Sequence, residues 1–314
     1  MKKLLYTITI YSFLILISLE LMVRVFHLGK DTPLRYLDHN KVEKWKPNQK
    51  GYAVTGNRRQ NFSEYRINNS GFNSYREFSP SYSQKEIALV GDSFIEGFHQ
   101  HYQNSIGKKI EQQLTDTEVY EYGYAGYDLA DQLHLIHAYK KDFDKIDQVF
   151  LGVKFSNDLT RDRYKVVQYR LNLDSPTNRL FKKSKLLVYA QNIGILDAPK
   201  RLINSLKAFV FPSQQTTSKK RTQKDTEVIY LANFEKLIKR YGFDKKRFTF
   251  LLDKENTSPL FIEHLEKNEY KYLDFSSEFS RSKKPKTLIY DKHWNNHGRD
   301  LIAKVIVDYI KKKS

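Results

Sequence analysis

The chain has 314 residues, no cysteine and a formal net charge of +18 at pH 7. The absence of cysteine excludes disulfide bonds, thiol catalysis and cysteine-ligated zinc. With 40% hydrophobic residues the chain can bury the core of one ordinary domain with additions, or of two small domains. The large positive charge indicates an anionic neighbour such as nucleic acid, anionic lipid or an acidic polymer.

An apolar run opens the chain from Leu4 to Val23, and Glu20 is its only charged residue. Twenty helical residues rise about 30 Å, which matches the hydrocarbon core of a bilayer. The alternative is a cleaved signal peptide, which needs small residues at its cleavage site, and residues 24–27 (RVFH) do not supply them. We therefore expect a retained single-pass transmembrane anchor at residues 1–27. Basic residues flank both ends of the run, but long domains translocate largely regardless of such charges, so we expect the domain that follows to be extracytoplasmic.

The next segment, residues 28–84, is polar and irregular, and we expect it to form a stalk and lead-in. From residue 85 onward, short apolar runs alternate with amphipathic stretches. The expected strands are 87–90, 119–124, 149–153, 247–252 and 270–275, and the expected helices are 128–143, 259–267 and 298–312. This alternation predicts βαβ units and a parallel sheet with helices on both faces.

A basic segment at residues 161–224 interrupts that alternation. It holds 15 Lys and Arg residues against three Asp residues, a net charge of +12. We expect an insertion over the sheet, with one or two amphipathic helices within 186–209 and a loop at 214–220. Two interpretations stay open for the charge: a surface for an anionic polymer or anionic lipid, and an ordinary solvated basic surface.

The tripeptide Gly91-Asp92-Ser93 follows the first apolar strand of this domain. Ligands of parallel sheets bind beyond the carboxyl ends of the strands, so a serine here is well placed for chemistry. The helix that follows presents free N–H groups to a developing oxyanion. Ser93 is therefore a candidate nucleophile, and the alternative is a serine that only caps a helix.

The segment Asp291-Lys292-His293-Trp294 contains a candidate base and its orienting group. A serine hydroxyl needs a base to take its proton, and the base needs an acceptor that fixes its tautomer. His293 and Asp291 supply both groups. The alternatives are a plain surface loop and a metal site with His297, but Trp294 stands where a zinc protease motif carries its glutamate, so we expect no metal.

Two further residues are candidate oxyanion donors. Asn157 follows the third strand and Gly126 follows the second. An amide side chain and a backbone N–H can both donate to an oxyanion. The alternatives are an ordinary Asx turn and a plain loop glycine. Nucleophile, donors and base thus all follow successive strands, whose ends meet at one edge of a parallel sheet.

This order of motifs resembles that of the SGNH (GDSL-like) hydrolases, whose four blocks carry Ser, Gly, Asn and His. The matching positions are Ser93, Gly126, Asn157 and His293 with Asp291. The lead-in at 68–72 (NNSGF) and the apolar helix ending in residues 20–24 (ELMVR) also look like those of membrane-anchored bacterial members. The resemblance implies a flavodoxin-like three-layer sandwich with about five parallel strands, at residues 85–314.

Three positions depart from the pattern of that family. Many members place Asp three residues before the His, whereas the gap here is two, as in an Asp-x-His-Trp subset. Glu121 stands where many members have Asn, and Phe155 stands where the third block usually has Gly. The last two departures concern the shape of the pocket more than the nucleophile.

The function that the resemblance implies is that of a serine esterase or O-acyltransferase, which needs no cofactor. The anchor and the basic insertion favour an acylated glycan of the cell envelope as substrate. A non-catalytic SGNH-fold protein that binds envelope glycans is the first alternative. Nucleic-acid binding is the second, but no zinc finger, helix-turn-helix or RNA-recognition signature supports it.

Overall fold

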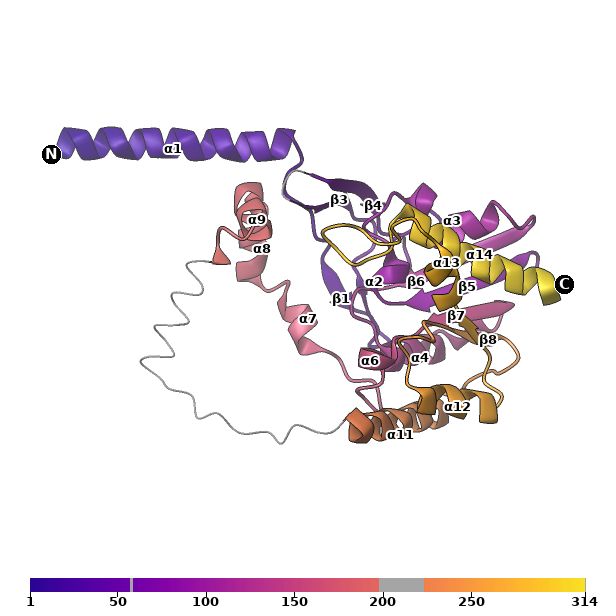
Figure 1. Cartoon of the computed structure of the whole chain (residues 1–314). Helices are drawn as coiled ribbons and strands as arrows, with labels where there is room; N and C mark the ends of the chain where they lie inside the picture. Colours follow the sequence, from indigo (N-terminus) through magenta and orange to yellow (C-terminus); the bar gives the residue numbers. More distant parts are fainter. Residues whose placement is uncertain (57–58, 198–222, 314) are drawn as a thin grey trace.

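A five-stranded parallel sheet forms the centre of the computed structural model, which describes residues 1–56, 59–197 and 223–313 (Figure 1). The strand order is β6-β5-β7-β8-β9, and every neighbouring pair is parallel. In chain order the strands are β5 (Lys85–Gly91), β6 (Thr117–Gly123), β7 (Gln148–Gly152), β8 (Phe248–Leu252) and β9 (Tyr272–Asp274). This 2-1-3-4-5 order is that of flavodoxin-like sheets, so the predicted α/β fold is confirmed.

Helices cover both faces of the sheet because both faces are apolar. Successive side chains of a strand point to opposite faces. Ile87 and Leu89 therefore pack against α3 (Ile106–Glu111) and α14 (Asn296–Lys313). Ala88 and Val90 pack on the other side with α4 (Leu129–Ala138), α11 (Gln223–Tyr241) and α12 (Pro259–Lys267). The remaining short helices are α2 (Ser93–Glu96), η1 (Tyr102–Asn104), α5 (Lys140–Phe143), α6 (Phe155–Asp158) and α13 (Ser276–Arg281).

The lead-in segment, expected as a stalk at 28–84, contains two antiparallel hairpins. They are formed by β1 (Arg35–Leu37) with β2 (Glu43–Trp45), and by β3 (Lys50–Thr55) with β4 (Asn61–Arg66). Trp45, Tyr65 and Phe72 are buried in the same apolar cluster as the sheet. Strands of three to six residues among polar neighbours give a weak apolar alternation, and this is why the pattern suggested an irregular segment.

Helix α1 (Lys2–Val25) extends away from the domain, and most of its apolar side chains are exposed (Figure 1). It is long and apolar enough to cross a membrane, a test that signal sequences also pass. Within the part of the chain that the structure describes, its last turns meet the rest of the protein, and Val23 there is 1% exposed.

The basic insertion begins with α7 (Gln168–Asn172), α8 (Pro176–Lys183) and α9 (Lys185–Asn192). Part of its positive charge lies in internal ion pairs. Arg161 binds Asp128 and Asp131 at 2.5 and 2.8 Å, and Arg170 binds Asp131 at 3.0 Å. The expected loop at 214–220 and the end of the expected helical stretch lie outside the described residues.

Candidate active site

The turn after β5 places Ser93 at the start of α2. Asp92 caps this helix, because its Oδ1 accepts the Phe94 N–H at 2.9 Å. A Cβ on Gly91 would lie 2.6 Å from Ile95 Cγ1, so the turn needs glycine there. The sequence thus builds a tight strand-to-helix turn that presents Ser93 at the carboxyl edge of the sheet.

The loop before α14 brings the predicted base and its orienting group to that serine. His293 Nε2 lies 2.6 Å from Ser93 Oγ, and its Nδ1 is hydrogen-bonded to Asp291 Oδ1. The His293 backbone N–H also donates to Asp291 Oδ1, at 3.0 Å. The loop is held by a bridge between Thr287 and Trp294. The three residues predicted as a triad therefore lie in hydrogen-bonding order.

A second histidine contacts the same carboxylate. His99 Nε2 lies 3.0 Å from Asp291 Oδ2, and its ring stacks on that of His293 with centroids 4.0 Å apart. The position of His99, six residues after Ser93, suggested at most a place in the wall of the pocket, because nothing in the local pattern links it to residue 291. The hairpin β3–β4 fixes its loop, since Asn61 Nδ2 donates to the His99 carbonyl at 2.8 Å.

The electrostatics of this cluster favour an ionised Asp291. Burial alone raises the pKa of Asp291, but hydrogen bonds from His293 and the nearby His99 outweigh burial and hold it below the usual value. Burial, with His293 adding to it, lowers the pKa of His99 to about 4. A neutral His99 with its proton on Nε2 donates to Asp291 and leaves Nδ1 bare. This agrees with the lack of a hydrogen-bond partner for the buried Nδ1 among the described residues.

The triad lies in a hollow of about 590 Å³ that we call the triad hollow. The lead-in segment forms one side of it through residues 30–33, Arg35 and residues 53–56. Asn192, at the end of α9, and Tyr290 also line it. Residues expected as a stalk thus form a wall of the candidate site.

Glu96 links that wall to α2, the helix that carries Ser93. Its carboxylate accepts the Trp45 indole N–H at 2.6 Å and the Ala125 N–H at 3.0 Å. Burial raises its pKa to about 7, and the two hydrogen bonds only partly offset this effect. Glu96 is three residues after Ser93 on α2, so it anchors the helix that carries Ser93 to the lead-in segment. A buried carboxylate on a short helix gave no sequence signal that predicted this contact.

The two predicted oxyanion donors lie outside the residues that line the triad hollow. Gly126 is exposed in a turn, with a φ of +91° that suits glycine. Asn157 is exposed on α6. Ala125, one residue before Gly126, does line the hollow, but its N–H is already bonded to Glu96. The roles of Gly126 and Asn157 stay predictions.

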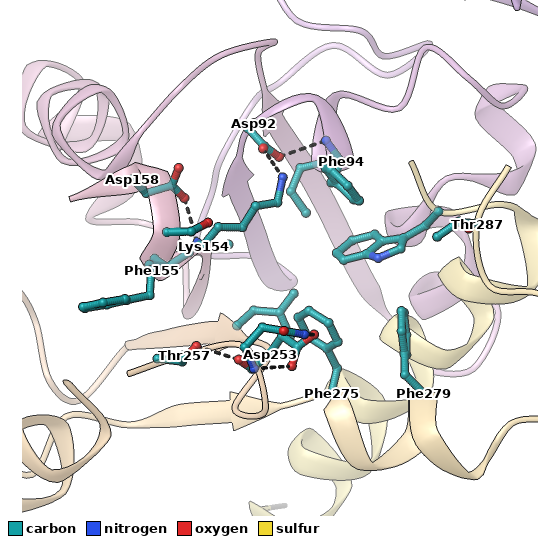
Figure 2. A pocket seen from close by; sticks show the side chains of 17 residues that line it. Asp92, Phe94, Lys154, Phe155, Asp158, Asp253, Thr257, Phe275, Phe279 and Thr287 are labelled. Carbon is teal, nitrogen blue, oxygen red and sulfur yellow. Dashed lines mark hydrogen bonds and ion pairs between the residues drawn. The ribbon is translucent and has the colours of Figure 1, made fainter. Parts of the chain in front are cut away.

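A second hollow, of about 330 Å³, has Phe94 in its wall (Figure 2). We call it the apolar hollow, because aromatic and aliphatic side chains form most of its wall. Lys154 reaches across its rim to Asp92 at 2.6 Å, with its ammonium 3.6 Å from the centre of the Phe94 ring. Phe155, which replaces the glycine common in the third block of SGNH hydrolases, is part of this wall.

In the described part of the chain, three residues that could bind a metal ion lie close together: His99, Asp291 and His293. Both Asp291 oxygens face imidazole nitrogens, so an ion there would have to replace the two contacts between Asp291 and the histidines. His297, the other histidine considered as a ligand, instead contacts the Ser282 hydroxyl at 2.7 Å. The arrangement is that of a hydroxyl, an imidazole and a carboxylate in hydrogen-bonding order.

Comparisons with known proteins give matches among solved structures. No family model matches the chain, and no curated protein matches it. A lipolytic G-D-S-L family protein from Veillonella parvula is 12% identical with a TM-score of 0.39, covering 73% of this chain and 99% of that one. A lipase/acylhydrolase from Enterococcus faecalis is 13% identical with a TM-score of 0.40, covering 73% and 96%. The esterase EstA from a Pseudoalteromonas species is 11% identical with a TM-score of 0.41, covering 73% and 97%. The first of these is described as a member of the G-D-S-L family, whose motifs the sequence resembles.

Proposed function

We propose that this protein is a serine esterase or O-acyltransferase that uses Ser93, His293 and Asp291 as its triad. The observation that carries the proposal is the 2.6 Å contact between Ser93 Oγ and His293 Nε2, with Asp291 on the far nitrogen. A hydroxyl, an imidazole and a carboxylate in this order convert a weak nucleophile into an active one.

The reaction begins when Ser93 Oγ attacks the carbonyl carbon of an acyl ester and its proton passes to His293 Nε2. Asp291 stabilises the imidazolium that forms. The tetrahedral oxyanion accepts a hydrogen bond from the Ser93 N–H at the start of α2, with Gly126 and Asn157 as the predicted further donors. When the intermediate collapses, His293 returns the proton to the leaving alcohol and an acyl-serine remains.

The acyl group then leaves Ser93 by the reverse path. A water molecule or a sugar hydroxyl attacks the acyl-serine while His293 takes its proton, and the proton finally returns to Ser93. Water as acceptor makes the protein an esterase, and a sugar makes it a transferase. Charged and polar groups line the triad hollow, among them Lys30, Asp31 and Arg35. This lining suits a hydroxylated substrate, and we propose an acylated cell-envelope glycan.

We also propose that α1 is kept as a single-pass membrane anchor, with the catalytic domain outside the cytoplasm. A signal peptide is removed, so it has no reason to be built into the mature fold. Here the Glu20 carboxylate accepts hydrogen bonds at 2.9 Å from the Ser184 hydroxyl and from the N–H groups of Lys185 and Leu186. These contacts support retention of the helix.

The decisive experiment is fluorophosphonate labelling of the detergent-solubilised full chain, comparing wild type with Ser93→Ala and His293→Ala. We expect labelling of the wild type and none of either variant. Ser156→Ala, at an exposed serine outside the triad hollow, is the matched control and should label like the wild type. A folded wild type that does not label would favour the alternative, a non-catalytic protein that binds envelope glycans.

A further inference from the structure

The end of helix α1 is fixed against α9. Besides the three hydrogen bonds to Glu20, the Arg24 guanidinium donates to the Lys183 carbonyl at 2.6 Å. Figure 1 shows α9 lying beside the last turns of α1. Since α9 begins at Lys185, the Glu20 carboxylate occupies the amino end of that helix, where a negative charge is stabilised. The carboxyl end of α1 is therefore held in place by α9.

The residues that follow α1 are held by the same helix. Lys185 forms an ion pair with Asp31, and a Cβ on Gly29 would lie 2.9 Å from the Lys185 carbonyl oxygen. The chain between the end of α1 and Asp31 thus runs closely along α9. Residues 26–31 thus link α1 to the domain and are held by contacts with Lys185.

This linking segment is also a wall of the triad hollow, through residues 30–33. Lys30 is five residues beyond the end of α1, so the hollow begins at most about 18 Å along the chain from the helix end. The 24 residues of α1 rise about 36 Å, more than the hydrocarbon core of about 30 Å. If α1 spans a membrane, its end lies among the headgroups and the hollow lies at the membrane surface.

The exposed side chains of α8 and α9 have the composition of a membrane interface. Leu180 is 68% exposed and Leu187 is 40% exposed. Arg179 and Lys183 lie on the same pair of helices and are exposed. Apolar side chains beside long cationic ones suit the boundary between headgroups and acyl chains.

We propose that the triad acts on esters carried by membrane-held molecules, presented close to the bilayer surface. This inference rests on the proposed serine chemistry and on the proposed anchor. It adds the way in which the substrate is held, because a site fixed near the membrane reaches an ester on a lipid headgroup or on a short lipid-linked glycan. An ester far out on a long polymer lies beyond the hollow.

The test uses the full chain in phospholipid vesicles with two lipid probes. Both carry the same acetoxy-nitrophenyl ester on the headgroup, one through a short linker and the other through a long flexible linker. Equal amounts in the same vesicles match their surface concentrations. We expect the short-linker ester to be cleaved about tenfold faster, because the fixed site meets it at a higher effective concentration.

A released variant tests whether the docking of α1 causes this preference. It combines Glu20→Gln and Arg24→Gln with twelve Gly and Ser residues inserted between His27 and Leu28, a spacer of about 20 Å on average. We expect it to lose the short-linker preference, to hydrolyse soluble nitrophenyl acetate like the wild type and to keep fluorophosphonate labelling. The same spacer inserted between Lys245 and Lys246, two exposed residues in the turn before β8, is the control and should keep the preference.

Equal or faster cleavage of the long-linker ester by the wild type would overturn the inference, and so would a released variant that keeps the preference. In both cases soluble hydrolysis would leave the proposed serine chemistry standing. Absence of cleavage of all three esters and of fluorophosphonate labelling would overturn the proposed function, and this inference with it.

Discussion

The triad hollow and the apolar hollow are both lined by aspartates, and the surroundings of Asp291 in the first and of Asp158 in the second shift the carboxyl pKa in opposite directions. In the triad hollow, hydrogen bonds from His293 hold the pKa of Asp291 below its usual value. In the apolar hollow, burial raises the pKa of Asp158 to about 8, although the Lys154 N–H donates to it at 2.8 Å. The pKa shifts favour the charged form of Asp291 and the neutral form of Asp158.

The two carboxyls therefore differ in their protonation state at neutral pH. An ionised Asp291 can stabilise an imidazolium, whereas a protonated Asp158 can only accept or donate a neutral hydrogen bond. Phe94 lines the apolar hollow, and the centre of its ring lies 4.6 Å from that of His293 and 4.8 Å from that of Trp294. We therefore expect changes in the triad hollow to alter the reaction, and changes in the apolar hollow to alter stability.

Ser93→Ala should give the largest effect. Removing the nucleophile of a serine triad lowers kcat by about 10⁶-fold, because the remaining groups cannot form an acyl-enzyme. The measurement is the rate of nitrophenyl acetate hydrolysis by the full chain in detergent. An activity within tenfold of the wild type in a folded Ser93→Ala protein would rule out this serine as the nucleophile.

Asp291→Asn should lower kcat by about 10⁴-fold, because an amide can stabilise the wrong imidazole tautomer and cannot balance the imidazolium charge. Asp253→Asn, at a residue that lines the apolar hollow, is the matched control. We expect the control to change kcat by less than about twofold. Similar losses in both variants would contradict the division of roles between the two hollows.

The sequence was most informative where the residues of one feature are close together in the chain. All five expected strands agree with β5, β6, β7, β8 and β9 to within about two residues at either end, since parallel strands appear as short apolar runs. Ser93 follows one such run, and Asp291 and His293 are two residues apart. Their convergence depends in addition on the loop between α13 and α14, which brings His293 to Ser93.

What could not be predicted depends on contacts between residues far apart in the chain. The pairing of His99 with Asp291 and of Glu96 with Trp45 requires the lead-in hairpins to fold onto the sheet, and no local pattern encodes this. The charge of the insertion is a similar case. A count of residues cannot distinguish a free cation from Arg161, which is paired with Asp128.

His99→Ala should lower kcat about tenfold at pH 7 and leave KM nearly unchanged, because it removes a hydrogen bond to Asp291 and the ring stacked on His293. His99→Gln should recover part of this loss, since its amide N–H can still donate to the carboxylate. The readout that separates positioning from simple structure is the profile of kcat against pH. With one donor fewer on Asp291, we expect the profile of His99→Ala to shift, and that of His99→Gln to lie between.

A second pH experiment tests His99 from the acid side. Its pKa of about 4 means that the wild type keeps a neutral His99 down to about pH 5. Below that, protonation adds a positive charge beside His293. We expect the wild type to lose activity more steeply than His99→Gln between pH 5 and pH 4. Identical acid limbs would contradict this assignment of His99.

Asp158→Asn should have the smallest effect on catalysis and a clear effect on the pH dependence of stability. A carboxyl whose folded pKa is raised stabilises the fold most below its unfolded pKa, near 3.9, and this contribution is lost as pH rises toward 8. The stability of the wild type relative to Asp158→Asn should therefore fall between pH 5 and pH 8, by at most about 1.4 kcal/mol per pH unit. Thermal unfolding of both full chains in detergent measures this difference as a change in the Tm gap.

Asn157→Ala, on the same short helix α6, replaces a residue that does not titrate and should show a Tm gap independent of pH. A constant gap for Asp158→Asn would mean that Asp158 is ionised in the folded protein, and the contrast between the two hollows would then be lost.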